Sequence, residues 1–353
     1  MNLLVFTRKV DQHDERAGFM SEWLTFLAAH LNKLIVICQE VGDISGLPNN
    51  VTVYSLGKES GKSKLYQLVK CQMLIVKCLP KVDGVFVHMI PHYSLLVGPW
   101  CKIFHKKLIQ WYAHGTVDRW LKLAHFWIDE FVTSSKDGFR LITKKPVHII
   151  GQGINIDKFK NQKPKIKIND KFIILTVGRI SPVKNLDILI KVIENIQHTD
   201  SVLRDKILLQ VIGGPGLPTQ ATYLKELEQA VTAKNLNNVI DFLGPLPPKE
   251  ILPYYQNADL FINLSDTGSL DKAVLEAMAA GLLILTANPA YQHIIPQELF
   301  LPTKEVNYIT QKITELYLLP SDKKNILQNQ LTTEVEQNHN LNNFIKKIIA
   351  LYE

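Results

Sequence analysis

Cysteine is scarce in this sequence, and it lacks the spacing of a metal or redox site. The chain of 353 residues has four cysteines, at Cys38, Cys71, Cys78 and Cys101. None of them forms a CxxC pair, and no clustered histidines accompany them, which argues against a zinc site or a thioredoxin-like motif. We expect small buried hydrophobic residues in a reducing cytosol, with no disulfide framework.

Long apolar runs are also missing. No stretch approaches the roughly 20 consecutive apolar residues that are needed to span a bilayer. The largely apolar residues 1–7 are followed directly by Arg8 and Lys9, whereas a signal peptide has its charges before a longer apolar core. The sequence therefore predicts a first strand and a cytoplasmic protein, for which a peripheral position on the inner face of the membrane stays open.

Acidic residues are few in the first half of the chain. Residues 1–160 hold 21 Lys and Arg against 13 Asp and Glu, and the remainder holds 19 against 20. This asymmetry predicts an anionic partner or surface for the first half, with a merely solvated basic face as the alternative. Because the aromatic residues do not alternate with Lys and Arg in a stacking pattern, we expect no nucleic acid partner.

Short apolar runs alternate with helical patterns along the whole chain. Nearly all these runs lack a polar face, which is typical of parallel strands covered on both sides, and the alternation predicts a doubly wound α/β architecture. The predicted strands are residues 3–7, 34–38, 51–54, 85–88, 108–112, 131–133, 147–150, 172–177, 207–212, 239–243, 260–263 and 283–286. The predicted helices include residues 20–31, 65–79, 305–318, 322–336 and 341–352.

A lysine-rich segment at residues 158–170 has little periodicity and is interpreted as a linker. It divides the chain into domains of residues 1–160 and 161–353, with the last helix free to pack back onto the first domain. Two such α/β halves create a cleft between them, and ligands in these folds bind beyond the carboxyl ends of the strands.

Two cations follow the first strand of the second half. Ser181 and Pro182 have the composition of a helix start. Arg179 and Lys184 lie beside this start, where a helix dipole makes each cation unfavourable by roughly 0.3–1 kcal/mol. A bound phosphate would explain this concentration of positive charge. The alternative is that both side chains pair with nearby carboxylates.

A Gly- and Ser-containing loop precedes another predicted helix in the second half. Asp271 is placed to cap this helix, and Gly281 is placed to end it. Glu276 lies in its apolar run and needs hydrogen-bond donors, which the two hydroxyls of a ribose would supply. A local ion pair is the alternative.

Together these stretches resemble the nucleotide-sugar domain of the retaining GT-B glycosyltransferases, the family-4-like group described as glycosyl transferases group 1. The resemblance implies two Rossmann-like domains, an N-terminal one for the acceptor and a C-terminal one for the donor. By the same resemblance Gly178, Arg179 and Lys184 hold the donor pyrophosphate. Phe242 and Leu243 lie at the turn whose backbone reads the nucleobase, and Glu276 binds the ribose.

The sequence departs from this family pattern at Gly268. It stands eight residues before Glu276, where the family usually has a first Glu for the donor sugar. The sugar and phosphate contacts are therefore expected from the intervening residues Ser269, Leu270, Asp271 and Lys272.

In the first half the resemblance is thinner. His114, before Gly115, resembles the strand-end His-Gly that supports transfer beside the donor sugar, and a hydrogen-bonded structural His is the alternative. Gly18, in the stretch 16–19, resembles a glycine-containing loop where backbone approaches phosphate or acceptor. Asn155 occupies a position at which the family more commonly has Asp.

The implied reaction is transfer of a hexose from a UDP- or GDP-linked sugar to a glycan or lipid-linked acceptor, with retention of configuration. There is no DxD-type carboxylate pair at a strand end, so we expect no metal and no other cofactor, and Arg179 and Lys184 would stabilise the leaving diphosphate. A nucleotide-sugar epimerase, a phosphorylase and a catalytically inactive partner subunit remain alternatives.

Two basic regions of the first half predict docking on an anionic membrane. One is the segment 62–79, with Lys62, Lys70 and Lys77 among apolar residues. The second is a cluster of Trp100, Lys102, His105, Lys106 and Lys107. The alternative for the segment is that its apolar residues pack on the sheet and leave the lysines in water, and these residues are Leu68, Met73, Leu74 and Ile75.

Overall fold

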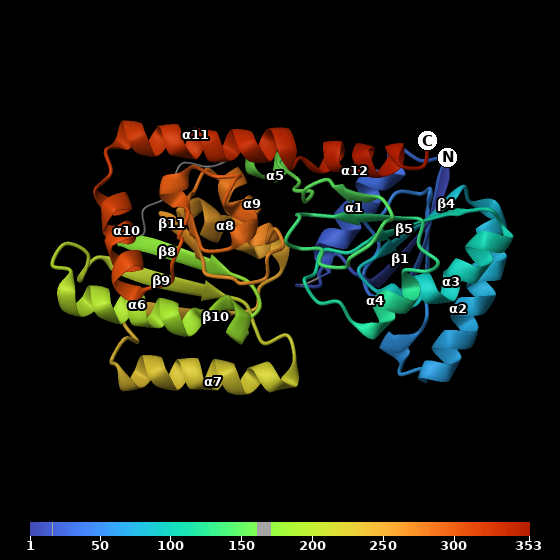
Figure 1. Ribbon diagram of the computed structural model, residues 1–353. Coiled ribbons are helices and arrows are strands. Elements are labelled where there is room, and N and C mark those ends of the chain that lie inside the picture. Colours follow the sequence, from blue (N-terminus) through green and yellow to red (C-terminus); the bar gives the residue numbers. More distant parts are fainter. Residues whose placement is uncertain (16, 161–170) are drawn as a thin grey trace. The chain divides into compact units, whose positions relative to one another are not determined.

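The chain folds into two compact units. The computed structural model describes residues 1–15, 17–160 and 171–353 (Figure 1). The first unit comprises Met1–Asn155 and Asn340–Glu353, and the second comprises Ile156–His339. Most of the predicted linker 158–170, and Arg16 in the predicted glycine loop, lie outside the described residues.

The first unit is built on a seven-stranded parallel sheet in the order β3-β2-β1-β4-β5-β6-β7. The chain runs outward from β1 to β3 and then returns to the other side of β1 at β4. That reversal is a topological switch point, where loops of doubly wound folds diverge. The strands are β1 (Asn2–Val10), β2 (Lys33–Val41), β3 (Val51–Ser55), β4 (Gly84–His88), β5 (Lys107–Trp111), β6 (Glu130–Thr133) and β7 (Val147–Ile149).

Helices cover both faces of this first sheet. One face packs against α1 (Gly18–Ala28) and the C-terminal α12 (Leu341–Ala350), with Trp23 against Phe344 at 4.5 Å between ring centroids. The opposite face packs against α2, α3 and α4. These helices and the 3-10 turns between them are η1 (Lys58–Ser60), α2 (Lys64–Cys78), η2 (Leu79–Lys81), α3 (Pro91–Ile103) and α4 (Arg119–Ala124).

All four cysteines are free and buried in these two cores, as predicted. Burial raises the pKa of the Cys38, Cys71 and Cys101 thiols to about 12, because a thiolate is poorly solvated there. They serve as small hydrophobic residues.

The second unit repeats the design with five parallel strands in the order β10-β9-β8-β11-β12. Its switch point lies between β8 and β11. The strands are β8 (Phe172–Val177), β9 (Ile207–Ile212), β10 (Ile240–Gly244), β11 (Leu260–Asn263) and β12 (Leu283–Thr286). The helices and turns are α5 (Asp157–Lys160), η3 (Pro182–Lys184), α6 (Leu186–Thr199), α7 (Pro218–Ala233), α8 (Pro248–Asn257), α9 (Lys272–Ala279), η4 (Pro289–Tyr291), η5 (Gln297–Leu299), α10 (Val306–Leu318) and α11 (Ser321–Asn338).

The twelve predicted strands and five predicted helices are confirmed, with ends displaced by no more than three residues. The predicted helix start at Ser181 is wrong. Residues Pro182–Lys184 form only a single 3-10 turn, because Asn185 takes a left-handed backbone conformation (φ 53°) and interrupts the helix. The α-helix begins afterwards, at Leu186.

Within the described ranges, no helix combines the length and the apolar character that crossing a membrane requires.

Candidate functional site

The candidate site of the second unit lies at its topological switch point. Strands β8 and β11 are neighbours in the sheet, with Leu260 paired to Ile174, yet they are far apart in sequence. Because both strands are parallel, the loops after their carboxyl ends start from the same edge of the sheet. These loops contain Gly178, Arg179 and Lys184 after β8, and Ser269, Leu270, Asp271 and Lys272 after β11.

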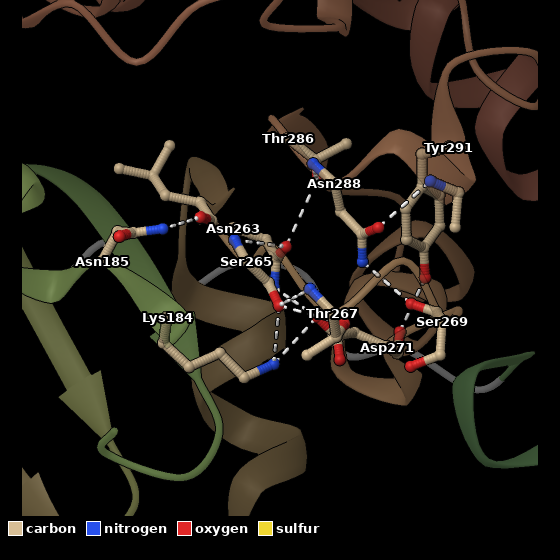
Figure 2. Close-up of polar contacts among 12 residues, drawn as sticks. Lys184, Asn185, Asn263, Ser265, Thr267, Ser269, Asp271, Thr286, Asn288 and Tyr291 are labelled. Carbon is tan, nitrogen blue, oxygen red and sulfur yellow. Dashed lines mark hydrogen bonds and ion pairs between the residues drawn. The ribbon is translucent and has the colours of Figure 1, made fainter. Parts of the chain in front are cut away.

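Lys184 and Asp271 form an ion pair across these loops. Lys184 Nζ lies 2.9 Å from Asp271 Oδ2 and 3.3 Å from Ser265 Oγ (Figure 2). The side chains are only 14% and 16% exposed, so water screens the pair weakly. For Lys184 the structure therefore has the carboxylate partner that the sequence left open as an alternative.

The sequence predicted that the side chain of Asp271 caps α9, and this prediction is wrong. Asp271 occupies the N-cap position, but its side chain accepts no hydrogen bond from the helix backbone. Its Oδ2 accepts instead from Lys184 and, at 3.0 Å, from Asn263 Nδ2. The predicted end of the helix is confirmed, since Gly281 is left-handed (φ 72°) and donates to the Met278 carbonyl.

A buried network of neutral side chains holds the loop that carries Asp271. Asn263 Oδ1 accepts from Thr286 Oγ1 at 3.3 Å, and Asn288 Nδ2 donates to the Ser269 carbonyl at 2.9 Å. Tyr291 donates its hydroxyl to the Asp271 carbonyl at 2.7 Å (Figure 2). Sequence reasoning missed these residues. The sequence signal that could have identified this network is the polar residue at the end of each of the two apolar strands β11 and β12.

The second carboxylate of this loop is also paired. Asp266 forms an ion pair with Lys304 and accepts from Asn185 Nδ2 at 2.8 Å. Burial alone would raise the pKa of Asp266, but the hydrogen bonds from Lys304 and Asn185 lower it below its usual value of 3.8. The backbone N–H of Asp266 donates to the Val183 carbonyl, which ties the loop to η3.

Glycines bring the loops after β8 and β9 into backbone contact. A Cβ at Gly213 would lie 1.8 Å from the Gly178 carbonyl oxygen, so only glycine fits there. Gly178 itself has φ 153°. Arg179 is exposed, and its side chain lies against Gly216, where a Cβ would be 3.0 Å from Arg179 Cδ.

Ser181 contributes a buried hydroxyl beside this contact. The residue is 2% exposed, and its Oγ has no hydrogen-bond partner among the described residues. Such a group is costly to bury unpaired, by about 1–3 kcal/mol. Its hydrogen-bonding capacity is therefore unused among the described residues.

Glu276 is half-buried on α9. Its Oε2 accepts from the hydroxyl of Tyr255 at 3.0 Å. Burial, and then the neighbouring Glu276 charge, raise the pKa of the Tyr255 hydroxyl well above its usual value, so Tyr255 is a neutral donor. This contact orients the carboxylate.

Phe242 and Leu243 lie near the end of β10. The strand register shifts between Phe242 and Gly244, and Gly244 is left-handed (φ 73°). Both residues line a cavity of about 320 Å³ between α7 and β10.

The comparison with protein families decides what this second unit is. The family profile described as glycosyl transferases group 1 matches residues 157–331. The second unit therefore belongs to the glycosyl transferases group 1 family. The family resemblance seen in the sequence is therefore confirmed.

Known relatives match this chain over part of their length. The D-inositol 3-phosphate glycosyltransferase of Geodermatophilus obscurus is 27% identical over 146 residues, which cover 39% of this chain and 32% of the relative. This chain thus spans about a third of the length of the curated relatives that it matches.

Solved structures resemble the chain over nearly its whole length. HepE of Anabaena, crystallised with UDP-glucose, matches with a TM-score of 0.75 at 16% identity, covering 99% of both chains. Sucrose-phosphate synthase of Thermosynechococcus elongatus matches with a TM-score of 0.77 at 14% identity, covering 99% of this chain and 98% of the other. The predicted GT-B fold of two Rossmann-like domains is confirmed.

The backbone at Gly268, where the sequence departs from the family pattern, has a conformation that favours glycine. Gly268 is buried and left-handed, with φ 68°. A Glu at this position would have to adopt a conformation that side chains rarely take. Ser269 and Lys272 are half-buried here, and Leu270 is 5% exposed.

The predicted residues of the first unit lie after strand β5 and at the start of helix α1. His114 follows β5 and is exposed, and its Nδ1 accepts from the Thr116 backbone N–H at 3.0 Å. A neutral ring with this hydrogen bond carries its proton on Nε2. Gly18 is the buried first residue of α1, and its N–H donates to the Asp14 carbonyl.

Proposed function

We propose that this glycosyl transferase moves a sugar from a nucleoside diphosphate sugar to an acceptor. The observation that carries the proposal is the half-buried Lys184 at the switch point, with Arg179 on the same loop and the unpaired Ser181 hydroxyl between them. Two cations with a hydroxyl between them suit a diphosphate, whose charge grows as the sugar departs. HepE, which shares the fold, binds UDP-glucose, and this supports UDP as the first nucleotide to test.

Each remaining residue of the site has a proposed role. Glu276, oriented by Tyr255, accepts from the ribose hydroxyls. Ser269, Leu270, Asp271 and Lys272 contact the sugar and phosphate, and the backbone at Phe242 and Leu243 contacts the base. His114 braces the transferred hexose through its Nε2–H, and Gly18 gives close access to the ligand.

We further propose that transfer retains configuration and needs no metal. Asp266 and Asp271, the carboxylates of the loop after β11, are already compensated by Lys304 and Lys184. This arrangement leaves Arg179 to meet the diphosphate charge, with Lys184 shared between Asp271 and the diphosphate. The proposed acceptor is a glycan or a lipid-linked acceptor, reached from the cytoplasm.

A panel of nucleoside diphosphates tests the proposal. A ligand at 100 times its Kd stabilises the protein by about 2.7 kcal/mol, so UDP, GDP or ADP should raise the melting temperature. Diphosphate release that requires an acceptor would establish transfer, whereas turnover without acceptor indicates an epimerase and turnover with inorganic phosphate indicates a phosphorylase. Gly268 favours a catalytically inactive partner subunit as second candidate, and the absence of any nucleotide binding would support it.

A further inference from the structure

Helix α2 presents apolar side chains on two opposite faces. The inner face is buried in the core of the first unit and consists of Cys71, Leu74, Ile75 and Cys78. The outer face consists of Leu65, Val69, Met73 and Val76, which are 70%, 52%, 68% and 43% exposed. Steps of four, four and three residues place these four on one side of the helix.

This arrangement decides between the two interpretations of the segment 62–79. Leu74 and Ile75 pack on the sheet, as the alternative expected, and they are 8% and 0% exposed. Leu68 and Met73 do not, since 43% and 68% of their surface is exposed. Folding therefore uses only one of the two apolar faces.

Positive charge accompanies the exposed face. Helix α2 contains no Asp or Glu. Lys62 and Lys70 lie over the ring of Tyr66, at 5.5 and 5.7 Å from its centroid, and Lys77 lies over Tyr54. In the described part of the chain, none of these three lysines forms a salt bridge with a carboxylate.

The second basic cluster of the sequence does not add to this face. Trp100 Nε1 donates to Gln72 Oε1 at 2.7 Å, which joins α3 to α2 where they run side by side (Figure 1). Lys102 pairs with Asp129, and Lys107 pairs with Glu130. The charges of Lys102 and Lys107 are therefore largely compensated within the protein, whereas Lys106 forms no salt bridge among the described residues.

We propose that the α2 outer face, defined as Leu65, Val69, Met73 and Val76 with Lys62, Lys70 and Lys77, docks on an anionic lipid bilayer. An exposed apolar strip of this kind marks an interaction surface. The adjacent lysines, which form no salt bridge among the described residues, and the lack of any carboxylate on the helix complement a negative surface. The 15 residues of α2 extend roughly 22 Å, long enough to lie in the interface with the strip among the lipid headgroups.

This docking is separate from the donor site, so it is tested without nucleotide. The full chain is sedimented with vesicles of phosphatidylcholine alone or with phosphatidylglycerol, at low and high salt. We expect binding to the anionic vesicles only, weakened by salt. Each lysine near such a surface contributes about a fivefold change in partition, so Lys70→Gln/Lys77→Gln should bind about 25-fold more weakly.

Matched variants separate the face from general charge and hydrophobicity. Leu65→Ser/Met73→Ser removes apolar surface that packs on nothing in the core, and should lower binding by at least about fivefold. Lys225→Gln/Lys323→Gln and Leu318→Ser/Ile326→Ser make the same changes at exposed positions of the second unit and should bind like wild type. Far-UV circular dichroism checks that each variant is folded.

Three results would overturn the proposal. The first is equal recovery with neutral and anionic vesicles at low salt. The second is unchanged binding of both α2 variants. The third is absence of vesicle binding together with self-association that the α2 variants abolish, which would assign the face to a second copy of the chain.

Discussion

Replacing Lys184 by Met tests how strongly the ion pair with Asp271 stabilises the second unit. Methionine keeps most of the aliphatic stem and removes the charge. At 2.9 Å, two unit charges attract by about 6 kcal/mol at an effective dielectric constant of 20. The lost hydration of two groups that are 14% and 16% exposed opposes most of this attraction.

The net effect is set by what Asp271 retains. In the variant its carboxylate keeps the hydrogen bond from Asn263 but loses its cation. We therefore expect Lys184→Met to lower the free energy of unfolding by about 2 kcal/mol. Lys184→Met/Asp271→Asn removes the uncompensated charge and should be more stable than the single variant, with a coupling energy of at least about 1 kcal/mol.

Urea unfolding followed by far-UV circular dichroism measures the change. All five tryptophans lie in the first unit, at Trp23, Trp100, Trp111, Trp120 and Trp127, so tryptophan fluorescence reports that unit and should be unaffected. Lys304→Met is the matched control, because it breaks a pair whose Asp266 side chain is 55% exposed, and such exposed pairs contribute about 0–1 kcal/mol. A coupling energy near zero, or equal losses in the variant and its control, would refute the reasoning.

Four further predictions address other residues. Glu276→Gln should weaken binding of ribonucleotides more than of deoxyribonucleotides in titration calorimetry, and an unchanged ribose preference would make Glu276 structural. His114→Ala should lower turnover and leave nucleotide affinity within a few fold; collapse of affinity at unchanged saturated turnover would contradict this. Burial alone would raise the pKa of Asp200, but hydrogen bonds from Thr314, Leu203 and Val202 lower this pKa below 3.8. The ionised Asp200 therefore stabilises the fold fully above pH 3.8, and this stabilisation is lost as the pH falls below that value. Asp200→Asn should therefore flatten acid unfolding in that range, and an unchanged acid profile would count against it. Transfer should survive an excess of EDTA, and loss of activity restored by Mg²⁺ would show that a metal is required.

The sheets and helices could be predicted because their signals are local. Strand β8, for example, is a run of six residues, five of them apolar, followed by a glycine, and helix α12 has a strongly one-sided apolar pattern. The helix start at Ser181 failed because a left-handed Asn185 interrupts the backbone, although the composition of Ser181 and Pro182 favours a start. Composition does not fix a single residue's φ.

The contacts of the site could not be predicted from spacing. Lys184 and Asp271 are 87 residues apart, and only the order of strands in the sheet brings them together. Asn288 meets the Ser269 backbone for the same reason. The sequence identified both members of the ion pair by residue type but could not show that they pair. From the sequence alone, Gly268 in place of the family's Glu suggests a lost function. The structure adds a conformational reason for glycine at this position, because its backbone is left-handed.

Titration calorimetry of one nucleoside diphosphate and its nucleoside, against wild type and Lys184→Met, tests the central claim most directly. The claim is that the loop after β8 binds the diphosphate of the donor. A charged hydrogen bond contributes roughly 1.5–3 kcal/mol, so the variant should bind UDP about 10- to 150-fold more weakly and uridine within about twofold of wild type. Equal losses for UDP and uridine, or unchanged UDP affinity in the variant, would contradict the assignment.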